Sequence, residues 1–302
     1  MPLTPMADIA GPARAAGRGV GAFNVIGIEH AEAIVTGAEL AGAPVVLQIS
    51  ENCAAYHGAL APIMTACLAI AGAAGVPAAV HLDHATSADL VREAAGLGAG
   101  SVMYDASARP YSGNVAATAD MARWCQHRGI WVEAELGEIG GKDGVHAPAA
   151  RTRPDEAAGY VAATGVDALA VAVGSSHAML TRDAVLDLGL ITLIRAAVSV
   201  PLVLHGSSGV PDQDLAGAIA AGMTKVNVAT QLNKAFTVAI RQSLANDSGM
   251  VDPRRYGAAG RDAIAAEVAR LLGVIGAADR AAPAGGRGWM AGGAGEALSP
   301  VE

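Results

Sequence analysis

Eight short apolar segments recur along the chain, and a longer, alanine-rich segment follows each of them. The short segments are rich in Val, Ile, Leu and Ala and are bounded by Gly, Pro, Ser or Asp, as buried strands are. They cover residues 21–26, 44–50, 78–84, 101–105, 131–137, 168–174, 201–206 and 225–230. Strands that alternate with helices pair in parallel through right-handed crossovers. The alternation therefore predicts an α/β fold built on a parallel sheet.

The longer segments carry apolar side chains at helical spacing. They predict helices that include residues 28–41, 212–221 and 258–276, with Asp212 as a candidate cap after a proline. Eight strand–helix units match the count of a (β/α)8, or TIM, barrel. A doubly wound open sheet is the competing fold, but it normally has a Gly-rich phosphate loop after its first strand, and NVIGIEH stands there instead.

We therefore predict a single (β/α)8 TIM barrel over residues 1–276. Residues 277–302 are low in complexity and are predicted to form a disordered tail. A long loop rich in Gly, Pro and charged residues follows the fifth strand at 137–153. Loops of this length are often functional lids, although a tolerated surface insertion is the alternative.

Composition narrows the classes of partner. The chain is 52% hydrophobic and 16% charged, which excludes global disorder. Its formal charge of -8 disfavours binding to a nucleic-acid backbone, but it leaves room for a small phosphorylated substrate. There is no long uninterrupted apolar run, no secretory signal and no cysteine pattern typical of a disulfide framework, so we expect no membrane partner and a cytoplasmic location.

Polar residues stand where the predicted strands end, and the carboxyl ends of barrel strands carry the active site. His84, His177 and His205 follow strands three, six and seven. Three neutral imidazoles suit Zn²⁺ and leave a coordination position for substrate, although any one of them alone could be an ordinary surface histidine.

Carboxylates stand close to these histidines. Asp83 could act as a general acid or base, or could support a neighbouring histidine. Asp105 and Glu135 could hold a second cation or an alternative position of the first, or either could form structural hydrogen bonds. His81 shares a strand face with Asp83, so we expect it to line the barrel or orient a neighbour rather than bind metal.

Two turns indicate a phosphate site. HGSSGVP at 205–211 follows the seventh strand, and KVNVAT at 225–230 leads into the next helix. Loops in these two places commonly bind phosphate in TIM barrels through backbone N–H groups and a helix amino end. Their order and position predict phosphate binding at residues of these turns.

Across residues 15–275 the chain resembles the class II, metal-dependent ketose-bisphosphate aldolases, which include fructose- and tagatose-bisphosphate aldolases. The motifs that carry the resemblance are AFNV, HLDH, GSVMYDAS, VEAELGEIGG, AVAVGSSH, PLVLHGSSG, KVNVAT and DPRRY. The resemblance implies a carbon–carbon lyase that cleaves a ketose 1,6-bisphosphate to dihydroxyacetone phosphate and glyceraldehyde 3-phosphate through a metal-stabilised enediolate.

The resemblance also assigns residues. It implies a zinc site at His84, His177 and His205, a second metal position at Asp105 and Glu135, and proton transfer by Asp83. It places the dihydroxyacetone phosphate moiety and the rest of the substrate among Asn24, Ser50, Gly206, Ser207, Ser208, Asn227 and Thr230.

Three further assignments come from the resemblance. Arg254 matches an arginine that reaches the distal phosphate in a neighbouring subunit, so the family implies homodimers or homotetramers. Asp143 is the nearest match to the second proton-transfer acid, where many relatives carry glutamate. Ala178 stands at a substrate-binding position where many relatives have glycine.

Several alternatives stay open at this point. Another divalent ion such as Co²⁺ could replace zinc. The sugar could be fructose- or tagatose-type, or it could carry one phosphate or none. A non-catalytic barrel subunit is a third reading, although such a subunit should have lost its metal or acid/base residues. A metal-dependent hydrolase is disfavoured because no HxH pair stands on an early strand.

Overall fold

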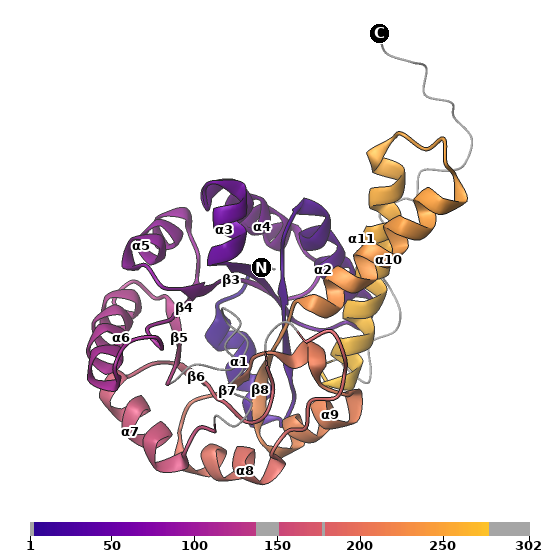
Figure 1. The fold of residues 1–302 in the computed structure, drawn as a ribbon. Coiled ribbons are helices and arrows are strands. Elements are labelled where there is room, and N and C mark those ends of the chain that lie inside the picture. The colour runs from indigo at the N-terminus through magenta and orange to yellow at the C-terminus, as the bar shows by residue number, and fades with distance from the viewer. Residues whose placement is uncertain (1–2, 137–150, 177–178, 278–302) are drawn as a thin grey trace.

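The computed structural model describes residues 3–136, 151–176 and 179–277. Eight parallel strands close into a barrel in which each strand pairs with the next and β8 returns to β1 (Figure 1). They are β1 (Val20–Asn24), β2 (Val45–Ser50), β3 (Ala78–Ala85), β4 (Ser101–Tyr104), β5 (Trp131–Glu135), β6 (Ala168–Ala170), β7 (Leu202–Leu204) and β8 (Met223–Val228). The predicted TIM barrel is confirmed.

Helices surround the barrel and bury the outward faces of the strands in one large apolar core. They are α2 (Ile28–Ala41), α3 (Glu51–His57), α4 (Ala61–Ala73), α5 (Ala88–Leu97), α6 (Tyr111–Gln126), α7 (Pro154–Thr164), α8 (Leu188–Ala197), α9 (Asp212–Ala221), α10 (Thr230–Asn246) and α11 (Pro253–Val274). The helices predicted over 28–41 and 212–221 match α2 and α9, and the third begins earlier than predicted, at Pro253.

Asp212 does not cap α9, so that prediction is wrong. It is the first helical residue, and the position before it is Pro211, which offers no side-chain hydrogen bond to the helix. The Asp212 carboxylate instead forms ion pairs with Arg182 and Arg270. Two cations outcompete the backbone N–H groups for a carboxylate that lies on the first turn.

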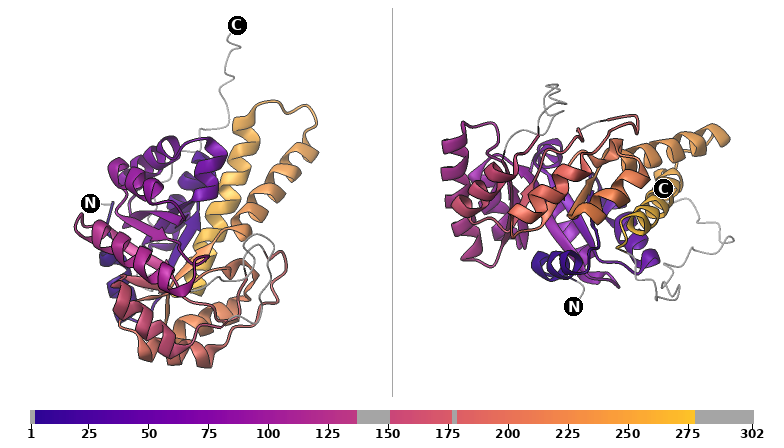
Figure 2. Two further views of the ribbon diagram at one scale, coloured as in Figure 1. Left: turned by 60° about the vertical axis from the view of Figure 1, so that its left-hand side comes forward. Right: turned by 90° about the horizontal axis from the view of Figure 1, so that it is seen from below.

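A helix that the sequence analysis did not identify closes the amino-terminal end of the barrel. This helix, α1 (Met6–Ala15), lies against one end of the strands (Figure 2). Its Met6 and Ile9 pack with Val46 and Trp131 in a separate apolar cluster inside the barrel. One end of the barrel is therefore sealed and apolar, and polar chemistry is confined to the other end.

The last two helices form an arm that projects from the barrel wall (Figures 1 and 2). Of the two, α11 packs against α2 and α10. Among the described helices, none is by itself long and apolar enough to cross a membrane; α3 and α4 reach that length only as a pair bent by 116°. The three cysteines, Cys53, Cys67 and Cys125, are buried and form no disulfide.

Candidate metal centre and active site

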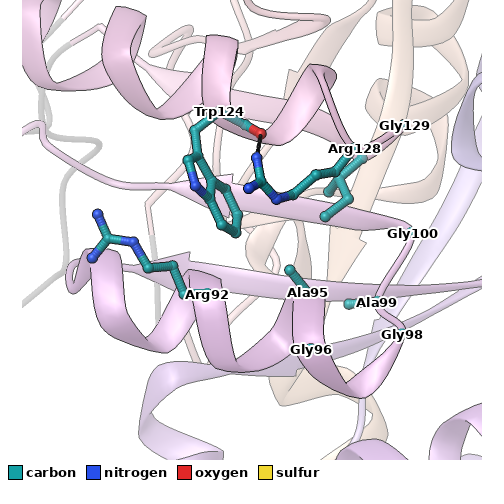
Figure 3. A pocket seen from close by; sticks show the side chains of 10 residues that line it. Arg92, Ala95, Gly96, Gly98, Ala99, Gly100, Trp124, Arg128 and Gly129 are labelled. Carbon is teal, nitrogen blue, oxygen red and sulfur yellow. Dashed lines mark hydrogen bonds between the residues drawn. The ribbon is translucent and has the colours of Figure 1, made fainter.

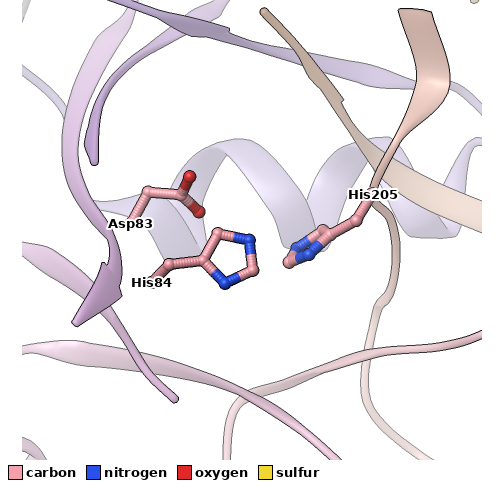
Figure 4. Close-up of side chains that lie close together, drawn as sticks. All are labelled: Asp83, His84 and His205. Atoms are coloured by element: carbon pink, nitrogen blue, oxygen red, sulfur yellow. The ribbon is translucent and has the colours of Figure 1, made fainter. Parts of the chain in front are cut away.

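Side chains from the ends of four strands, β3, β4, β5 and β7, converge at the carboxyl-terminal mouth of the barrel. Asp83, His84 and His205 point toward one another (Figure 4), and each offers a ligand atom within 4.8 Å of the others. His84, Asp105 and Glu135 form a second group with the same spacing. Two ligands of one zinc ion lie roughly 3–4 Å apart, so small side-chain movements bring either group to coordination distance.

Adjacent residues of a strand normally face opposite sides of a sheet, but Asp83 and His84 both face the mouth. His84 has a left-handed backbone with φ of 52°, and the β3–β4 register shifts between Leu82 and Ala85. A non-glycine residue in this conformation is strained, and such strain is held where the surrounding structure requires it. The irregularity turns the His84 ring beside the Asp83 carboxylate.

Asp105 holds the His84 ring. The Nδ1 atom of His84 lies 2.8 Å from Oδ2 of Asp105. Because a carboxylate accepts hydrogen bonds, Nδ1 is the donor, and Nε2 is the ring nitrogen that this hydrogen bond does not engage. The other oxygen of Asp105, Oδ1, accepts from the Ser107 hydroxyl at 2.6 Å and from its backbone N–H at 3.1 Å. Both Asp105 oxygens are therefore engaged within the protein.

Glu133 holds the His205 ring in the same way. His205 Nε2 donates to Glu133 Oε1 at 2.8 Å, and His205 Nδ1 lies 3.5 Å from Glu135 Oε2. Lys225 Nζ donates to the second oxygen of Glu133, Oε2, also at 2.8 Å. His205, Glu133 and Lys225 are at most 1% exposed. The result is a chain of charged hydrogen bonds that ends at a candidate metal ligand.

For both His205 and Glu133, burial and the neighbouring charges shift the pKa in opposite directions, and the neighbouring charges together have the larger effect. Burial alone would lower the pKa of His205, but the hydrogen bonds to Glu133 and Glu135 raise the pKa to about 9. Burial alone would raise the pKa of Glu133, but the Lys225 ammonium and the His205 ring bring it below its ordinary value. In the metal-free protein His205 is thus an imidazolium held between carboxylates.

Asp83 is buried and ionised. Burial would raise its pKa, but His84, His205 and Lys225 outweigh burial, so the pKa lies below its ordinary value. Its Oδ1 atom has no hydrogen-bond partner among the described residues. A buried carboxylate oxygen without a partner is unfavourable unless a ligand satisfies it. Asp83 therefore has both the charge and the vacant acceptor that a proton-transfer group needs.

His81 lines the barrel as predicted and is not a member of either candidate metal group. Its Nδ1 atom lies 2.6 Å from the Ser101 hydroxyl, and its Nε2 atom lies 3.9 Å from Glu133 Oε2. Burial and the nearby Lys225 lower the pKa of His81 to about 3, so the ring is neutral.

The two turns predicted to bind phosphate lie side by side. Gly206 precedes the short helix η2 (Ser207–Gly209), and Thr230 begins α10. The Ser207 hydroxyl donates to the backbone carbonyl of Asn227, and the Ser208 hydroxyl accepts from the backbone N–H of Gln231. The Asn227 side-chain oxygen is buried without a hydrogen-bond partner among the described residues. These contacts join the loops after β7 and β8 into one surface.

Two other predicted substrate residues lie at the ends of β1 and β2. The Asn24 side-chain oxygen accepts from Gln48 Nε2 at 3.1 Å. The Ser50 hydroxyl accepts from the backbone N–H of Cys53 and thereby caps α3. Ser50 thus has a structural task, and its hydroxyl proton remains available as a donor.

Arg254 is not brought to the barrel mouth within one chain. It lies on the first turn of α11, and α10 leads 17 residues out from the mouth to that end of the arm. A helix of that length spans about 25 Å at 1.5 Å per residue. The Arg254 side chain is exposed and pairs with Asp252. His177, Ala178 and Asp143 lie outside the described residues.

Sequence reasoning gave no role to Glu133 and Lys225, although a signal for both was present. Each stands two positions before a predicted site residue in the same strand, Glu133 before Glu135 and Lys225 before Asn227. Side chains two apart in a strand share a face, so both should point into the barrel one step below its mouth.

A second missed group anchors the end of β5. The Asn114 amide donates to the carbonyl oxygens of Glu135 and Leu136, both at 3.1 Å. The Asn114 side-chain oxygen in turn accepts from Tyr160 at 2.7 Å and from Thr118 at 2.9 Å. Asn114, Thr118 and Tyr160 are fully buried. These hydrogen bonds fix the backbone that carries Glu135. A contact between two helices and the end of a strand cannot be predicted from a local sequence pattern.

A cavity of about 530 Å³ lies elsewhere, between the carboxyl ends of α5 and α6 (Figure 3). It is lined by the loops that lead into β4 and β5, so it opens at the end of the barrel opposite the candidate metal groups. Arg128 stacks on Trp124 with 4.0 Å between its guanidinium carbon and the ring centroid, and it donates to the Trp124 carbonyl. None of the residues that line this cavity belongs to either candidate metal group, so we do not assign the reaction to it.

Comparison with known proteins agrees with the geometry. A model of the family described as class-II fructose-bisphosphate aldolase matches residues 4–280. A fructose-bisphosphate aldolase from Geobacillus stearothermophilus is 36% identical over 286 residues, which are 93% of this chain and 100% of that protein. The crystal structure of the YdjI aldolase from Escherichia coli K12 has a TM-score of 0.82 and 30% identity, and covers 93% of this chain and 100% of that one. The resemblance inferred from the sequence is confirmed: the chain belongs to the class II fructose-bisphosphate aldolase family and is an aldolase, a carbon–carbon lyase.

Proposed function

We propose that the protein reversibly cleaves a ketose 1,6-bisphosphate to dihydroxyacetone phosphate and glyceraldehyde 3-phosphate, with a bound divalent metal, most suitably Zn²⁺. The observation that carries the proposal is the buried Asp83 carboxylate, one oxygen of which has no hydrogen-bond partner within the described part of the chain, beside the ring nitrogens of His84 and His205. A vacant acid/base group next to metal-binding nitrogens is what aldol cleavage needs.

The metal would be held by His84 and His205, with His177 as the third imidazole. The donor types fit zinc, and the hydrogen bonds to Asp105 and Glu133 each engage one ring nitrogen, so we propose that the other ring nitrogen of each described histidine is the one that coordinates the metal. When bound, the metal acts as a Lewis acid that polarises the ketone and stabilises negative charge on the ketose fragment. Asp105 and Glu135 are proposed to offer a second cation position near His84.

Asp83 would take the proton from the C4 hydroxyl in the cleavage direction and return it in condensation. Its lowered pKa keeps it ionised at neutral pH, which is the form that accepts a proton. A second group must exchange the proton at the nucleophilic carbon of dihydroxyacetone phosphate, and Asp143 is proposed for that role.

The phosphate next to the ketone would lie over the joined loops after β7 and β8. Gly206, Ser207 and Ser208 present backbone and hydroxyl donors there, and Thr230 lies at the amino end of α10, where backbone N–H groups and the helix dipole favour an anion. Asn24, Ser50, Asn227 and Ala178 are proposed to line the rest of the sugar site.

Arg254 is proposed to bind the distal phosphate from the arm of a second copy. The arm carries Arg254 too far from its own barrel mouth, so the proposal requires a homodimer or homotetramer. The apolar side chains exposed on the arm, Val238, Leu244 and Val251, are compatible with such an assembly. We also propose that the protein is located in the cytoplasm.

A coupled assay tests this function. Fructose 1,6-bisphosphate, tagatose 1,6-bisphosphate and the corresponding 1-phosphates are compared with and without a strong chelator. We expect cleavage of one bisphosphate, loss of activity with the chelator and recovery with Zn²⁺ or Co²⁺. Faster cleavage of a 1-phosphate would favour the alternative, a metal-dependent aldolase of a singly phosphorylated sugar, and unaltered activity after complete metal removal would refute the proposal.

A further inference from the structure

A layer of charged side chains lies inside the barrel below its mouth. Its residues, Glu133 and Lys225, precede mouth residues of the same strands by two positions. Glu133 and Lys225 form a direct ion pair in this layer, with 2.8 Å between Oε2 and Nζ. Their side chains are 0% and 1% exposed, respectively. Directly below, the barrel is filled by the apolar cluster around α1. The pair therefore lies between a dry apolar core and the candidate metal ligands.

Such a pair is a poor way to stabilise a barrel. Removing two charges from water costs several kcal/mol per ion, and well-packed apolar replacements are often equally stable or more stable. TIM barrels commonly fill this region with branched apolar side chains. A buried ion pair here consequently calls for a role other than stability.

The hydrogen bonds of Glu133 point to that role. One of its oxygens accepts from Lys225 and the other accepts from His205 Nε2. Because Glu133 can only accept, Nε2 of His205 carries a proton. Nδ1 is the ring nitrogen on the other side, 3.5 Å from Oε2 of Glu135, which belongs to the second candidate metal group. Lys225 balances the charge of Glu133 and fixes the position of its carboxylate.

We infer that Glu133 and Lys225 are a positioning pair, which holds the His205 ring with Nδ1 directed at the metal position. The inference rests on the proposed function, because it concerns how the protein presents a ligand to the metal. Neither residue touches substrate. Their effect is on metal affinity, since a ring that can rotate or bind through the wrong nitrogen must be ordered when the metal enters.

Two double variants test the pair without leaving one charge buried alone. E133L/K225M removes the ion pair and the acceptor for His205, whereas E133Q/K225M removes the charges but keeps an acceptor oxygen. Thr164→Val is the matched control, because it removes a different fully buried hydrogen bond, from Thr164 to the Tyr160 carbonyl on α7.

Three quantities are measured on the full-length chain: the thermal midpoint of the chelated protein, the Zn²⁺ affinity by competition with a chromophoric chelator, and the absorption of the Co²⁺-loaded protein. For E133L/K225M we expect an unchanged or higher midpoint, roughly 10–100-fold weaker Zn²⁺ binding and an altered Co²⁺ spectrum. E133Q/K225M should bind Zn²⁺ with intermediate affinity, and Thr164→Val should bind it as the unaltered protein does.

Zinc affinity within twofold of the unaltered protein in E133L/K225M would overturn the inference. So would a failure of E133Q/K225M to fold, because the pair would then be structural. If the unaltered protein itself bound neither Zn²⁺ nor Co²⁺, the proposed function would fail, and that result is distinct from the first two.

Discussion

Asp83 and His84 are consecutive residues of β3, yet both side chains face the mouth of the barrel, because His84 adopts a left-handed backbone with φ of 52°. The irregularity places the carboxylate that we propose for proton transfer beside an imidazole that we propose as a metal ligand. A regular strand would have turned one of them into the apolar layer under the helices.

Asp83→Ala should separate metal binding from chemistry. The remaining histidines should still hold zinc, while turnover should fall about 100–10,000-fold because a positioned acid/base group contributes that much. Zinc content and kcat are measured on the same preparation, with the exposed Asp89→Asn as a control. Near-normal kcat in Asp83→Ala would remove its proposed role.

Arg254→Ala should weaken use of the distal phosphate. Losing a charge-assisted hydrogen bond of roughly 1.5–3 kcal/mol should lower kcat/KM for the bisphosphate about 10–100-fold. The rate with the corresponding 1-phosphate should stay the same, because that substrate lacks the group that Arg254 binds. Arg255→Ala is the matched control, since Arg255 is also exposed on the first turn of α11 and pairs with Asp247. Equal losses on both substrates would argue against the assignment.

Gly206→Ala should destabilise the protein by about 1–3 kcal/mol. Gly206 has φ of 64°, and a Cβ atom there would lie 2.5 Å from the backbone carbonyl of Ser176 on the loop after β6. Denaturant titration measures the change. Gly96→Ala is the control, because a Cβ atom on Gly96 meets nothing within 4 Å and alanine favours the helix. Equal stability of the two variants would show that the loops after β6 and β7 can separate freely.

The metal-free protein should lose stability as the pH rises from about 6.5 to about 9. Folding raises the pKa of His205 from its ordinary value of 6.5 to about 9, so the folded state binds an extra proton in this window. The stabilisation is complete below the lower value and is lost as the pH passes the higher one. Thermal midpoints of the chelated protein measure it, and His205→Gln should flatten the slope. A midpoint that rises across this window would contradict the assigned pKa.

The strands and their order were predictable because each barrel strand is a short buried run with clear boundaries. The mouth residues were predictable for the same reason, since carboxyl ends of parallel strands meet at one end of a barrel. His84 was a candidate because it follows the strand pattern, although its left-handed backbone leaves no mark in the sequence.

What escaped prediction depends on contacts between distant segments. The Glu133–Lys225 pair joins β5 to β8, and the Asn114 amide joins α6 to the end of β5. Asp212 has the residue type of a helix cap, but it is the first residue of α9, and its carboxylate pairs with Arg182 and Arg270 instead. The local sequence indicates which interactions a residue is able to form. Which partner it contacts depends on the tertiary structure of the closed barrel.

Anomalous diffraction from crystals grown with zinc tests most directly whether the three histidines hold one metal ion. We expect one zinc ion about 2.0–2.1 Å from a ring nitrogen of each of His84, His177 and His205, with the Asp83 carboxylate beside it. Zinc bound elsewhere, with the His84 and His205 rings turned away from each other, would contradict this expectation.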